Sequence, residues 1–361
     1  MQAIHARIAC KQAPTAQPIR SGPLRGIGPL RMNNTLIQPT LKNGGRGLTI
    51  SVIIPTYKRA NLILETLGSV FAQSYKPSEI IVVNDGSPDC TEEVLTPLVS
   101  AERITYVRQE NQGLAAARNK GISLATGDYI ALLDDDDLWP PDTLESQIKF
   151  MKKHPETVLC YGDVFWFKDS AALPEGLDAS KCSLSLLHPP VGMVEKRFLR
   201  RNWITSPGQT LIKRGVLENI GGFDRNFRTC EDYELYIRLA KQGPFAFTGR
   251  VCLFYRRQGG SLSSDVELMY RNYNLVREKH LGGMMILRYP VLWIISYLGF
   301  HRYTFRRFLT EARVQIDCGN FSQGRRLLVR AIQIFPLGLL QPSYYKLGLR
   351  SLSRATAPQP E

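Results

Sequence analysis

Short aliphatic runs alternate with amphipathic segments over the first part of the chain. The runs predict strands, because about four to eight apolar residues bounded by polar or turn-forming residues are typical of buried strands. They occupy residues 49–54, 79–83, 103–107 and 129–133. The intervening segments predict helices over about 60–73, 91–99 and 113–125. In the last of these we expect a buried stripe formed by Leu114, Ala117, Gly121 and Leu124. Strands that alternate with helices indicate an α/β protein with a mainly parallel sheet flanked by helices.

The pattern changes after residue 140. Pro141 is expected to open a helix that buries Leu144, Ile148 and Met151. From about 159 to 264 the pattern loosens and indicates mixed α and β structure. Residues 285–350 predict helices, with a helical hairpin over 305–336 that turns at Gly319-Asn320. Residues 1–47 lack apolar periodicity and are rich in Pro, Gly, Asn and Arg, so we expect them to be disordered.

Polar residues follow three of the predicted strands. They are Pro55-Thr56-Tyr57, Asn84-Asp85-Gly86-Ser87 and the run from Asp134 to Asp137. In open parallel sheets, ligands bind outside the carboxyl ends of the strands. We therefore expect these three segments to gather on one edge of the sheet and to form the binding site.

The four consecutive aspartates, Asp134 to Asp137, carry the most specific chemistry. Carboxylates this close repel one another and raise each other's pKa unless a cation or hydrogen-bond donors compensate. A hard divalent ion held by oxygen ligands is the simplest compensation. The alternative is that part of the run caps the turn before Pro140-Pro141, but capping requires one acidic residue and not four.

The net charge of +14 is unevenly distributed. Residues 1–47 carry +7 and residues 280–361 carry +8, which leaves −1 for residues 48–279. Basic ends suggest an anionic partner such as a membrane surface, although solvated tails and helix faces would explain them equally well. The near-neutral middle and the lack of a known nucleic-acid motif argue against a nucleic-acid partner.

Cysteine usage and hydropathy bear on the compartment. The seven cysteines are scattered, odd in number and without a CxxC pair, which favours a reducing environment. No apolar run reaches the roughly 18 residues that span a bilayer. We therefore expect a cytoplasmic protein, with possible peripheral attachment to the inner face of a membrane. Trp293, Tyr297 and Phe300 near Arg302 and Arg306-Arg307 are the candidate contacts with that membrane.

A set of short motifs in a fixed order resembles family 2 glycosyltransferases. The motifs are Ser51 to Tyr57, Val82 to Ser87, Glu110 to Gly113 with Ala117-Arg118-Asn119, Leu133 to Pro140, Gly221 to Asp224, Glu231 to Leu235, and Tyr255-Arg256-Arg257. Each motif alone is weak, whereas their order and spacing over residues 49–265 are specific. The resemblance implies a GT-A fold and inverting transfer of a sugar from a nucleotide-sugar donor.

The resemblance assigns the aspartate run to metal and donor binding. Asp134 and Asp136 have the family's DxD spacing, so Asp136 is expected to be the direct ligand of Mn²⁺ or Mg²⁺, with Asp134 as a second ligand that also contacts the donor. Asp135 is expected to face ribose or the metal shell, and Asp137 to be structural. Gln258 stands where many members of the family have a histidine, which puts a third protein ligand in doubt and favours Mg²⁺ or a water-filled shell.

Other positions are expected to bind the nucleotide-sugar. Pro55, Thr56, Tyr57 and Arg59 belong to the first strand-to-helix loop, where the family contacts the nucleoside. In the second loop, Asp85 with Gly86 matches the family's base-binding aspartate, with an Asx-type turn as the alternative. Arg118, on the helix after Gly113, is expected to reach the nucleotide or the aspartates; otherwise it is a solvated helix arginine.

Glu231 and Asp232 are the expected catalytic pair. They precede a helix over 233–241 whose buried face carries Leu235 and Leu239. Attack by an acceptor hydroxyl needs a base that takes its proton, and the resemblance gives this role to Asp232. The alternative is a helix N-terminus that simply favours acidic residues, and its dipole would lower the pKa of the aspartate and weaken the base.

Together these expectations define three regions. Residues 1–47 are a basic extension, residues 48–265 a GT-A domain, and residues 266–361 a basic helical region. Within the GT-A domain, residues 48–140 would bind the nucleotide and residues 141–265 the acceptor. The expected function is metal-dependent sugar transfer to a glycan or lipid-linked acceptor in cell-envelope polysaccharide or glycolipid synthesis. The alternative is a nucleotide-sugar-binding protein that has lost catalysis.

Overall fold

A computed structural model describes residues 47–168, 184, 186, 188–257, 265–282, 290–336 and 347 of the chain. Two expectations lie outside these residues. They are the disorder expected before Gly47 and the substitution of histidine by Gln258.

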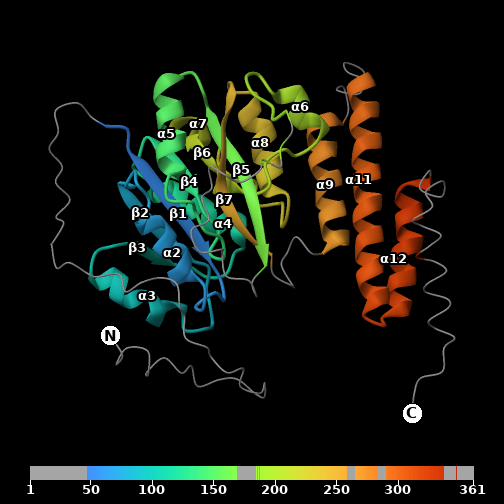
Figure 1. Cartoon of the computed structure of the whole chain (residues 1–361), viewed down its shortest axis with the longest axis horizontal. Helices are drawn as coiled ribbons and strands as arrows, with labels where there is room; N and C mark the ends of the chain where they lie inside the picture. Colours follow the sequence, from blue (N-terminus) through green and yellow to red (C-terminus); the bar gives the residue numbers. More distant parts are fainter. Residues whose placement is uncertain are drawn as a thin grey trace, which may run out of the picture.

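A seven-stranded sheet forms the centre of the protein (Figure 1), in the order β3-β2-β1-β4-β6-β5-β7. Its strands are β1 Ile50–Thr56, β2 Glu79–Asn84, β3 Thr105–Arg108, β4 Tyr129–Leu132, β5 Leu159–Lys168, β6 Thr210–Lys213 and β7 Phe245–Arg257. Strands β1 to β4 pair in parallel, β6 is antiparallel to both of its neighbours, and β5 is parallel to β7. The four strands predicted in the first part of the chain are confirmed, and the sheet is mixed but mainly parallel.

Helices cover both faces of the sheet, as the alternation of strands and helices predicts (Figure 1). The helices are α2 Ile63–Phe71, α3 Thr91–Ser100, α4 Leu114–Leu124, α5 Thr143–Lys153, α6 Glu195–Arg200, α7 Arg214–Asn219 and α8 Glu231–Ala240. One apolar cluster joins α2, α3 and α5 to one face, and a second joins α4, α6, α7 and α8 to the other. Strand β1 serves both clusters, since Ile53 packs into one and its neighbours Val52 and Ile54 into the other.

Helix α4 corrects one expectation about its buried stripe. Ala117 and Gly121 are buried, but Leu124 is exposed at the end of the helix, and Ile122 is buried in its place. The helix lies very close to β1, since a Cβ built on Gly121 would be 2.3 Å from Cγ2 of Ile53. Small residues on this face therefore bring the backbone of α4, and the side chain of Arg118 with it, close to the sheet.

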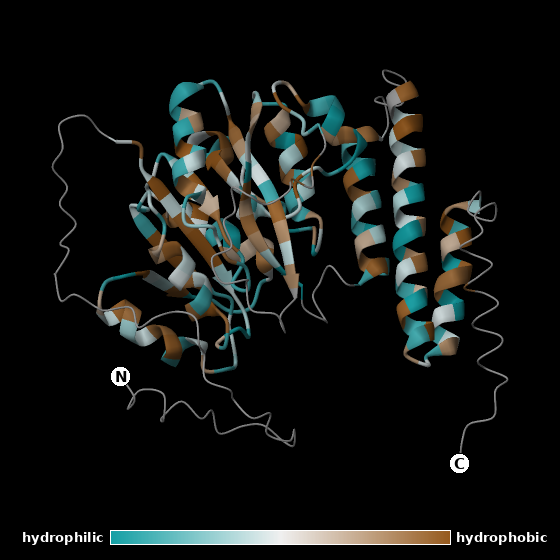
Figure 2. Cartoon of the chain, in the orientation of Figure 1, coloured by the Kyte–Doolittle hydropathy of each residue, from teal (hydrophilic) through white to brown (hydrophobic). Residues whose placement is uncertain are grey.

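The C-terminal region is helical, as predicted. It contains α9 Val266–Leu281, α11 Pro290–Asp317 and α12 Phe321–Ile334. Gly319 has a φ of +85° in the turn between α11 and α12, which confirms the predicted hairpin and its turn. Figure 2 shows apolar and polar positions interleaved along α11, and no helix of the described part of the chain is long and apolar enough to cross a membrane.

Candidate active site

Three polar segments meet at one edge of the sheet, as expected from the strand order. Strands β1 and β2 end side by side, with Thr56 paired to Asn84, and the aspartate run follows β4 on the other side of β1. The backbone N–H of Tyr57 donates to Oδ2 of Asp135 at 3.2 Å. The first loop and the aspartate run are therefore in direct contact.

Arg59 lies over the middle of the aspartate run. Its guanidinium is 3.9 Å from the carboxylate of Asp135 and 3.4 Å from that of Asp136. These are longer than the distances of a charge-assisted hydrogen bond, so Arg59 compensates the two carboxylates only in part. Pro55 and Thr56 are buried in β1 directly beneath this contact.

Arg118 connects the aspartate run to the predicted catalytic pair. It is only 1% exposed, and its guanidinium forms ion pairs of 2.6 Å with both Asp134 and Glu231. It also lies over the ring of Phe223, at 5.2 Å from the centroid. Burial alone would lower the pKa of Arg118, but Asp134 and Glu231 outweigh burial and raise it. Arg118 is therefore a buried bridge and not a solvated helix residue.

Asp135 and Asp136 are less well compensated than Asp134, which pairs with Arg118. Burial and the neighbouring Asp136 raise the pKa of Asp135 to about 7, although Thr56 and Arg59 oppose the shift. Burial and Asp134 raise the pKa of Asp136 to about 6. Burial and the repulsion between neighbouring carboxylates therefore outweigh the nearby arginines, as the sequence predicted for adjacent carboxylates.

Asp137 has a different environment from the other three aspartates. It is buried, its Oδ1 accepts from the backbone N–H of Arg256 at 2.9 Å, and Nε of Arg256 donates to the carbonyl of Asp136 at 2.8 Å. These bonds fix the loop after β4 to the end of β7. These contacts agree with the structural role expected of Asp137.

Asp85 is buried and uses both oxygens within the protein. Oδ1 accepts from the side chain of Gln109 and the backbone N–H of Gln112, and Oδ2 accepts from the N–H of Gly113. The preceding Asn84 also fixes this loop, since its Oδ1 accepts from the N–H of Ser87, three residues on. Asp85 therefore holds the loop that leads into α4, and its contact with a base stays a prediction.

Gly86 permits that arrangement. Its φ is +72°, and a Cβ there would lie 2.9 Å from the backbone nitrogen of Asn111. A side chain at Gly86 would push the loop 109–113 away from β2, which explains why glycine follows Asp85.

Glu231 and Asp232 form the first turn of α8, after Cys230 in a left-handed conformation with a φ of +63°. Oδ1 of Asp232 accepts from the N–H of Tyr233 at 2.7 Å. Burial and the adjacent Glu231 raise the pKa of Asp232 to about 7, while Arg118 lowers it. The alternative, in which the helix dipole depresses this pKa, is not favoured, because burial and the neighbouring carboxylate outweigh the dipole.

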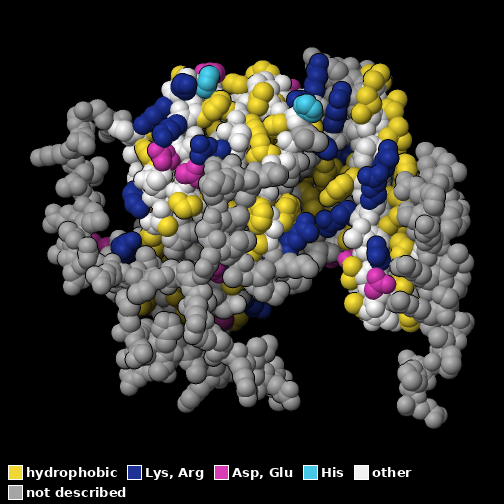
Figure 3. Space-filling model, in the orientation of Figure 1, with side chains coloured by type: hydrophobic (Ala, Val, Ile, Leu, Met, Phe, Trp, Pro, Cys, Tyr) yellow, Lys and Arg dark blue, Asp and Glu magenta, His cyan; other side chains and the backbone are white. Residues whose placement is uncertain are grey.

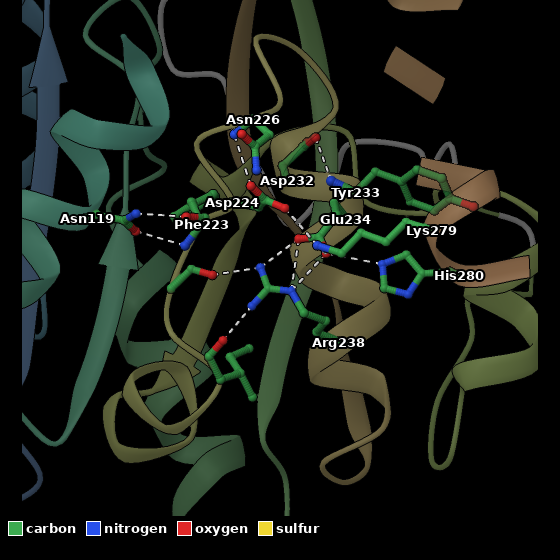
Figure 4. Close-up of polar contacts among 12 residues, drawn as sticks. Asn119, Phe223, Asp224, Asn226, Asp232, Tyr233, Glu234, Arg238, Lys279 and His280 are labelled. Carbon is green, nitrogen blue, oxygen red and sulfur yellow. Dashed lines mark hydrogen bonds and ion pairs between the residues drawn. The ribbon is translucent and has the colours of Figure 1, made fainter. Parts of the chain in front are cut away.

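A polar network missed by the sequence analysis surrounds the start of α8 (Figure 4). Glu234 is fully buried and binds Arg238 through both oxygens, while Lys279 and His280 of α9 contact its Oε1 at 2.6 and 3.1 Å. Lys279 also pairs with Asp224 at 2.7 Å. Helix α8 is thereby fixed to α9 next to the predicted catalytic pair. Glu234 itself, two positions after Asp232, was the signal for this network in the sequence. Its partners on α9 lie far along the chain, so the network could not be foreseen.

Asn119 fixes the other side of this region. Its side chain donates to the carbonyl of Phe223 and accepts from the N–H of the same residue, both at 2.8 Å (Figure 4). Phe223 in turn contacts Arg118. The pair Arg118-Asn119 therefore positions the loop that precedes α8 as well as the carboxylates on either side.

Asp134 and Asp136 are the candidate protein ligands of a divalent ion. Among the described residues, no group of three or more His, Cys, Asp and Glu side chains is arranged to hold a metal. Asp136 and Asp134 nevertheless offer oxygen ligands in a region short of positive charge, which suits a hard cation with other ligands from a bound molecule or water. The two residues thus fit a shared site better than a closed protein cage.

Comparisons with known proteins agree with this geometry. A family model described as Glycosyl transferase family 2 matches residues 51–221. The putative teichuronic acid biosynthesis glycosyltransferase TuaG of Bacillus subtilis is 33% identical over 220 residues, which cover 60% of this chain and 82% of TuaG. The chain belongs to glycosyltransferase family 2.

A further relative of this glycosyltransferase is an uncharacterized glycosyltransferase of Rickettsia conorii. It is 47% identical over 230 residues, which cover 60% of this chain but only 36% of the Rickettsia protein. The glycosyltransferase thus spans about a third of the length of that relative.

Solved structures confirm the GT-A fold of this glycosyltransferase. The mannosyltransferase PcManGT of Pyrobaculum calidifontis, in complex with GDP-Man and Mn²⁺, aligns with a TM-score of 0.54 at 19% identity and covers 88% of this chain and 87% of its own. TarS 1–349 of S. aureus, in complex with UDP-GlcNAc, aligns with a TM-score of 0.54 at 17% identity, covering 85% and 89% of the two chains.

Proposed function

We propose that this enzyme transfers a sugar from a nucleotide-diphosphate donor to an acceptor hydroxyl, with inversion and with a divalent metal. The observation that carries the proposal is the pair of 2.6 Å contacts through which Arg118 joins Asp134 to Glu231, next to Asp232. They bring the acidic run and a carboxylate with a pKa of about 7 to one edge of the sheet. A donor site and a general base need this proximity.

Donor binding is assigned to the edge formed by β1, β2 and β4. Pro55, Thr56, Tyr57 and Arg59 would line the nucleoside side, with Asp85 and Gly86 behind the base. Asp135 would face the ribose, and Asp136 with Asp134 would hold Mn²⁺ or Mg²⁺. The metal, when bound, neutralises the charge that develops on the leaving diphosphate. Arg118, which pairs with Asp134 at 2.6 Å, would orient that carboxylate toward the site.

Asp232 is assigned the proton transfer. Its pKa of about 7 is close to the pH at which a general base works best, because the group is then ionised often enough and still basic enough. Glu231 contributes by raising that pKa, while its own pairing with Arg118 keeps it away from the acceptor. The acceptor hydroxyl would lose its proton to Asp232 as it attacks the anomeric carbon.

The acceptor class follows from the relatives and from the charge of the chain. TuaG is described as an enzyme of teichuronic acid biosynthesis, which supports a cell-envelope polysaccharide or a lipid-linked glycan as the acceptor here. The basic C-terminal region supports a cytoplasmic enzyme that works peripherally at the inner face of a membrane.

Nucleotide binding and catalysis are tested separately. UDP-, GDP- and dTDP-sugars are screened by thermal shift with and without Mn²⁺, and we expect one nucleotide class to raise the melting temperature more when metal is present. Transfer is then followed by product analysis, with NMR of the anomeric proton to report inversion. If no nucleotide stabilises the protein, the donor site is refuted.

Asp232→Asn distinguishes an active enzyme from the alternative, a nucleotide-sugar-binding protein without catalysis. We expect the variant to bind the donor as the wild type does and to lose about 10²- to 10⁴-fold in turnover. Glu156→Gln, at an exposed carboxylate in the loop after α5, is the matched control and should keep full activity. Unchanged turnover in Asp232→Asn would remove the base assignment, and binding without turnover in the wild type would favour the alternative.

A further inference from the structure

The N-terminal half of α11 leaves an apolar face uncovered. Helix α11 has 28 residues, whereas its partner α12 has 14. Over the C-terminal half of α11, the face toward α12 is buried through residues such as Phe305, Leu309 and Ala312. The N-terminal half extends beyond this pairing.

Four exposed residues continue along that free half. Val291, Ile294, Ile295 and Leu298 have the spacing i, i+3, i+4, i+7 and share one face of the helix. Their exposed fractions lie between 45 and 67%. We call these four residues the apolar stripe. Large aliphatic side chains rarely stay this exposed in a contiguous row unless the row has a partner.

The aromatic residues expected to contact a membrane do not form this row. Phe300 is buried and stacks on Tyr270 and Tyr273 at 5.7 and 4.4 Å. Trp293 is partly buried against the core and stacks on Tyr297. The expectation that Phe300 contacts a membrane is therefore wrong, and the aliphatic positions between these aromatic residues face outward instead.

Positive charge flanks the apolar stripe. Exposed basic residues follow the apolar stripe along α11 at Arg302 and Arg306. Between residues 290 and 310 there is no Asp or Glu. Figure 3 shows apolar side chains along the outer edge of α11 with Lys and Arg side chains beside them.

Helix α6 lies beside the same half of α11. The hydroxyl of the buried Ser296 donates to the carbonyl of Leu199 at 2.9 Å, so α6 packs on the face of α11 opposite the apolar stripe and leaves the stripe outward. Aliphatic side chains flanked by cations match the two layers of an anionic membrane surface, whose phosphates lie above the acyl chains. An acidic protein or a nucleic acid would leave the aliphatic row without a complement.

We propose that the apolar stripe and the basic residues Arg302 and Arg306 of α11 form a docking surface for an anionic lipid bilayer. The helix would lie in the interface with its aliphatic residues among the acyl chains and its arginines at the phosphates. This proposal deepens the proposed function and rests on it for the acceptor. Tyr233, next to Asp232, donates to the carbonyl of Phe198 in α6 at 2.7 Å. Docking would therefore hold the catalytic helix near a lipid-linked acceptor.

Vesicle cosedimentation of the full-length protein tests the surface. Vesicles of phosphatidylcholine are compared with vesicles that also contain phosphatidylglycerol, and we expect binding to the anionic vesicles only. Two variants remove the two components, Ile294→Ser with Leu298→Ser, and Arg302→Gln with Arg306→Gln. Loss of two cations should lower partitioning about thirtyfold, because each contributes about 1 kcal/mol at an anionic surface.

Matched controls change the same residue types elsewhere. Val314→Ser removes an exposed aliphatic residue from the other half of α11, and Lys153→Gln removes an exposed cation from α5. Both should bind vesicles as the wild type does. Nucleotide-induced thermal shifts are measured on every variant, since docking variants should retain them even if the sugar-transfer assignment fails.

Three results would overturn the proposal. One is a wild-type protein that does not sediment with anionic vesicles. Another is equal loss of binding in Val314→Ser or Lys153→Gln. The third is a wild-type dimer in light scattering that becomes a monomer in Ile294→Ser with Leu298→Ser, which would make a second copy of the chain the occupant of the apolar stripe.

Discussion

Replacing Arg118 by methionine should destabilise the protein strongly, because two buried carboxylates would lose their common cation. Each of the two ion pairs is 2.6 Å long, and the arginine is almost fully buried. A hydrogen bond to a charged group contributes about 1.5–3 kcal/mol, so two predict about 3–6 kcal/mol. Breaking a buried ion pair by removing one partner costs about 3–5 kcal/mol, which agrees. We expect a loss of about 4 kcal/mol in the free energy of unfolding.

Urea denaturation followed by tryptophan fluorescence and circular dichroism measures this loss. Lys149→Met is the control, because the pair of Lys149 with Glu145 is also 2.6 Å long but lies on the exposed side of α5. It should cost less than about 0.5 kcal/mol. Because the ion pairs in the two variants have the same length, the difference in their free energies of unfolding reports mainly the effect of burial.

A second substitution identifies the cause of the loss. Glu231→Gln in the Arg118→Met background removes one of the two carboxylates left without a cation, so it should restore part of the stability while turnover stays low. A loss below about 1 kcal/mol in Arg118→Met, or no recovery in the double variant, would refute the reasoning that uncompensated buried charge is responsible.

Three further predictions concern the site and its supports. Gly121→Val should destabilise the protein by about 1–3 kcal/mol in urea, since a Cβ there meets the side chain of Ile53 at 2.3 Å. Metal-free enzyme should lose stability as the pH rises from about 4 to about 7. The pKa of Asp135 is raised from its ordinary value to about 7, so the folded state binds more protons than the unfolded state in that range. For Asp135 alone the change is at most about 4 kcal/mol, at about 1.4 kcal/mol per pH unit. Glu234→Gln should cost about 3 kcal/mol and lower the melting temperature, because Arg238 and two residues of α9 lose a buried anion.

Each of these predictions has its own control. Gly68→Ala changes a helical glycine that has open space around its Cα and should be neutral or stabilising. Asp135→Asn should flatten the pH dependence of stability, and a profile as steep as that of the wild type would show that other groups cause it. Glu218→Gln breaks an exposed pair with Arg214 and should have little effect. A loss as large as that of Glu234→Gln would contradict the argument from burial.

The first half of the fold was predictable because three of its four strands, β1, β2 and β4, are buried on both faces. Such strands are continuous apolar runs, and the parallel order follows from the helices between them. Strand β6 escaped the prediction, since its four residues, Thr210–Lys213, have no alternation, and its antiparallel placement depends on contacts with β4 and β5. Leu124 was misplaced because helical periodicity does not show where α4 ends.

The candidate site was predictable where its chemistry is local in sequence. The aspartate run and the pair Glu231-Asp232 stand out as short motifs, but their connection through Arg118 spans 113 residues and leaves no pattern. The raised pKa of Asp232 could not be foreseen, because a helix dipole is visible in sequence and burial is not. The metal, the base and the nucleotide contacts stay predictions until ligands and variants are measured.

The contacts of Lys279 and His280 have a consequence for anyone who shortens this protein or exchanges its C-terminal half. Both residues belong to α9, beyond the boundary at residue 265 expected from the motifs, yet both contact Glu234 in the helix that carries Asp232. A polypeptide that stops at 265 would leave this buried glutamate with Arg238 alone. The smallest catalytic unit should therefore extend through Gly282. Chimeras with relatives should be joined within residues 283–289, where the helix that supports the catalytic residues has already ended.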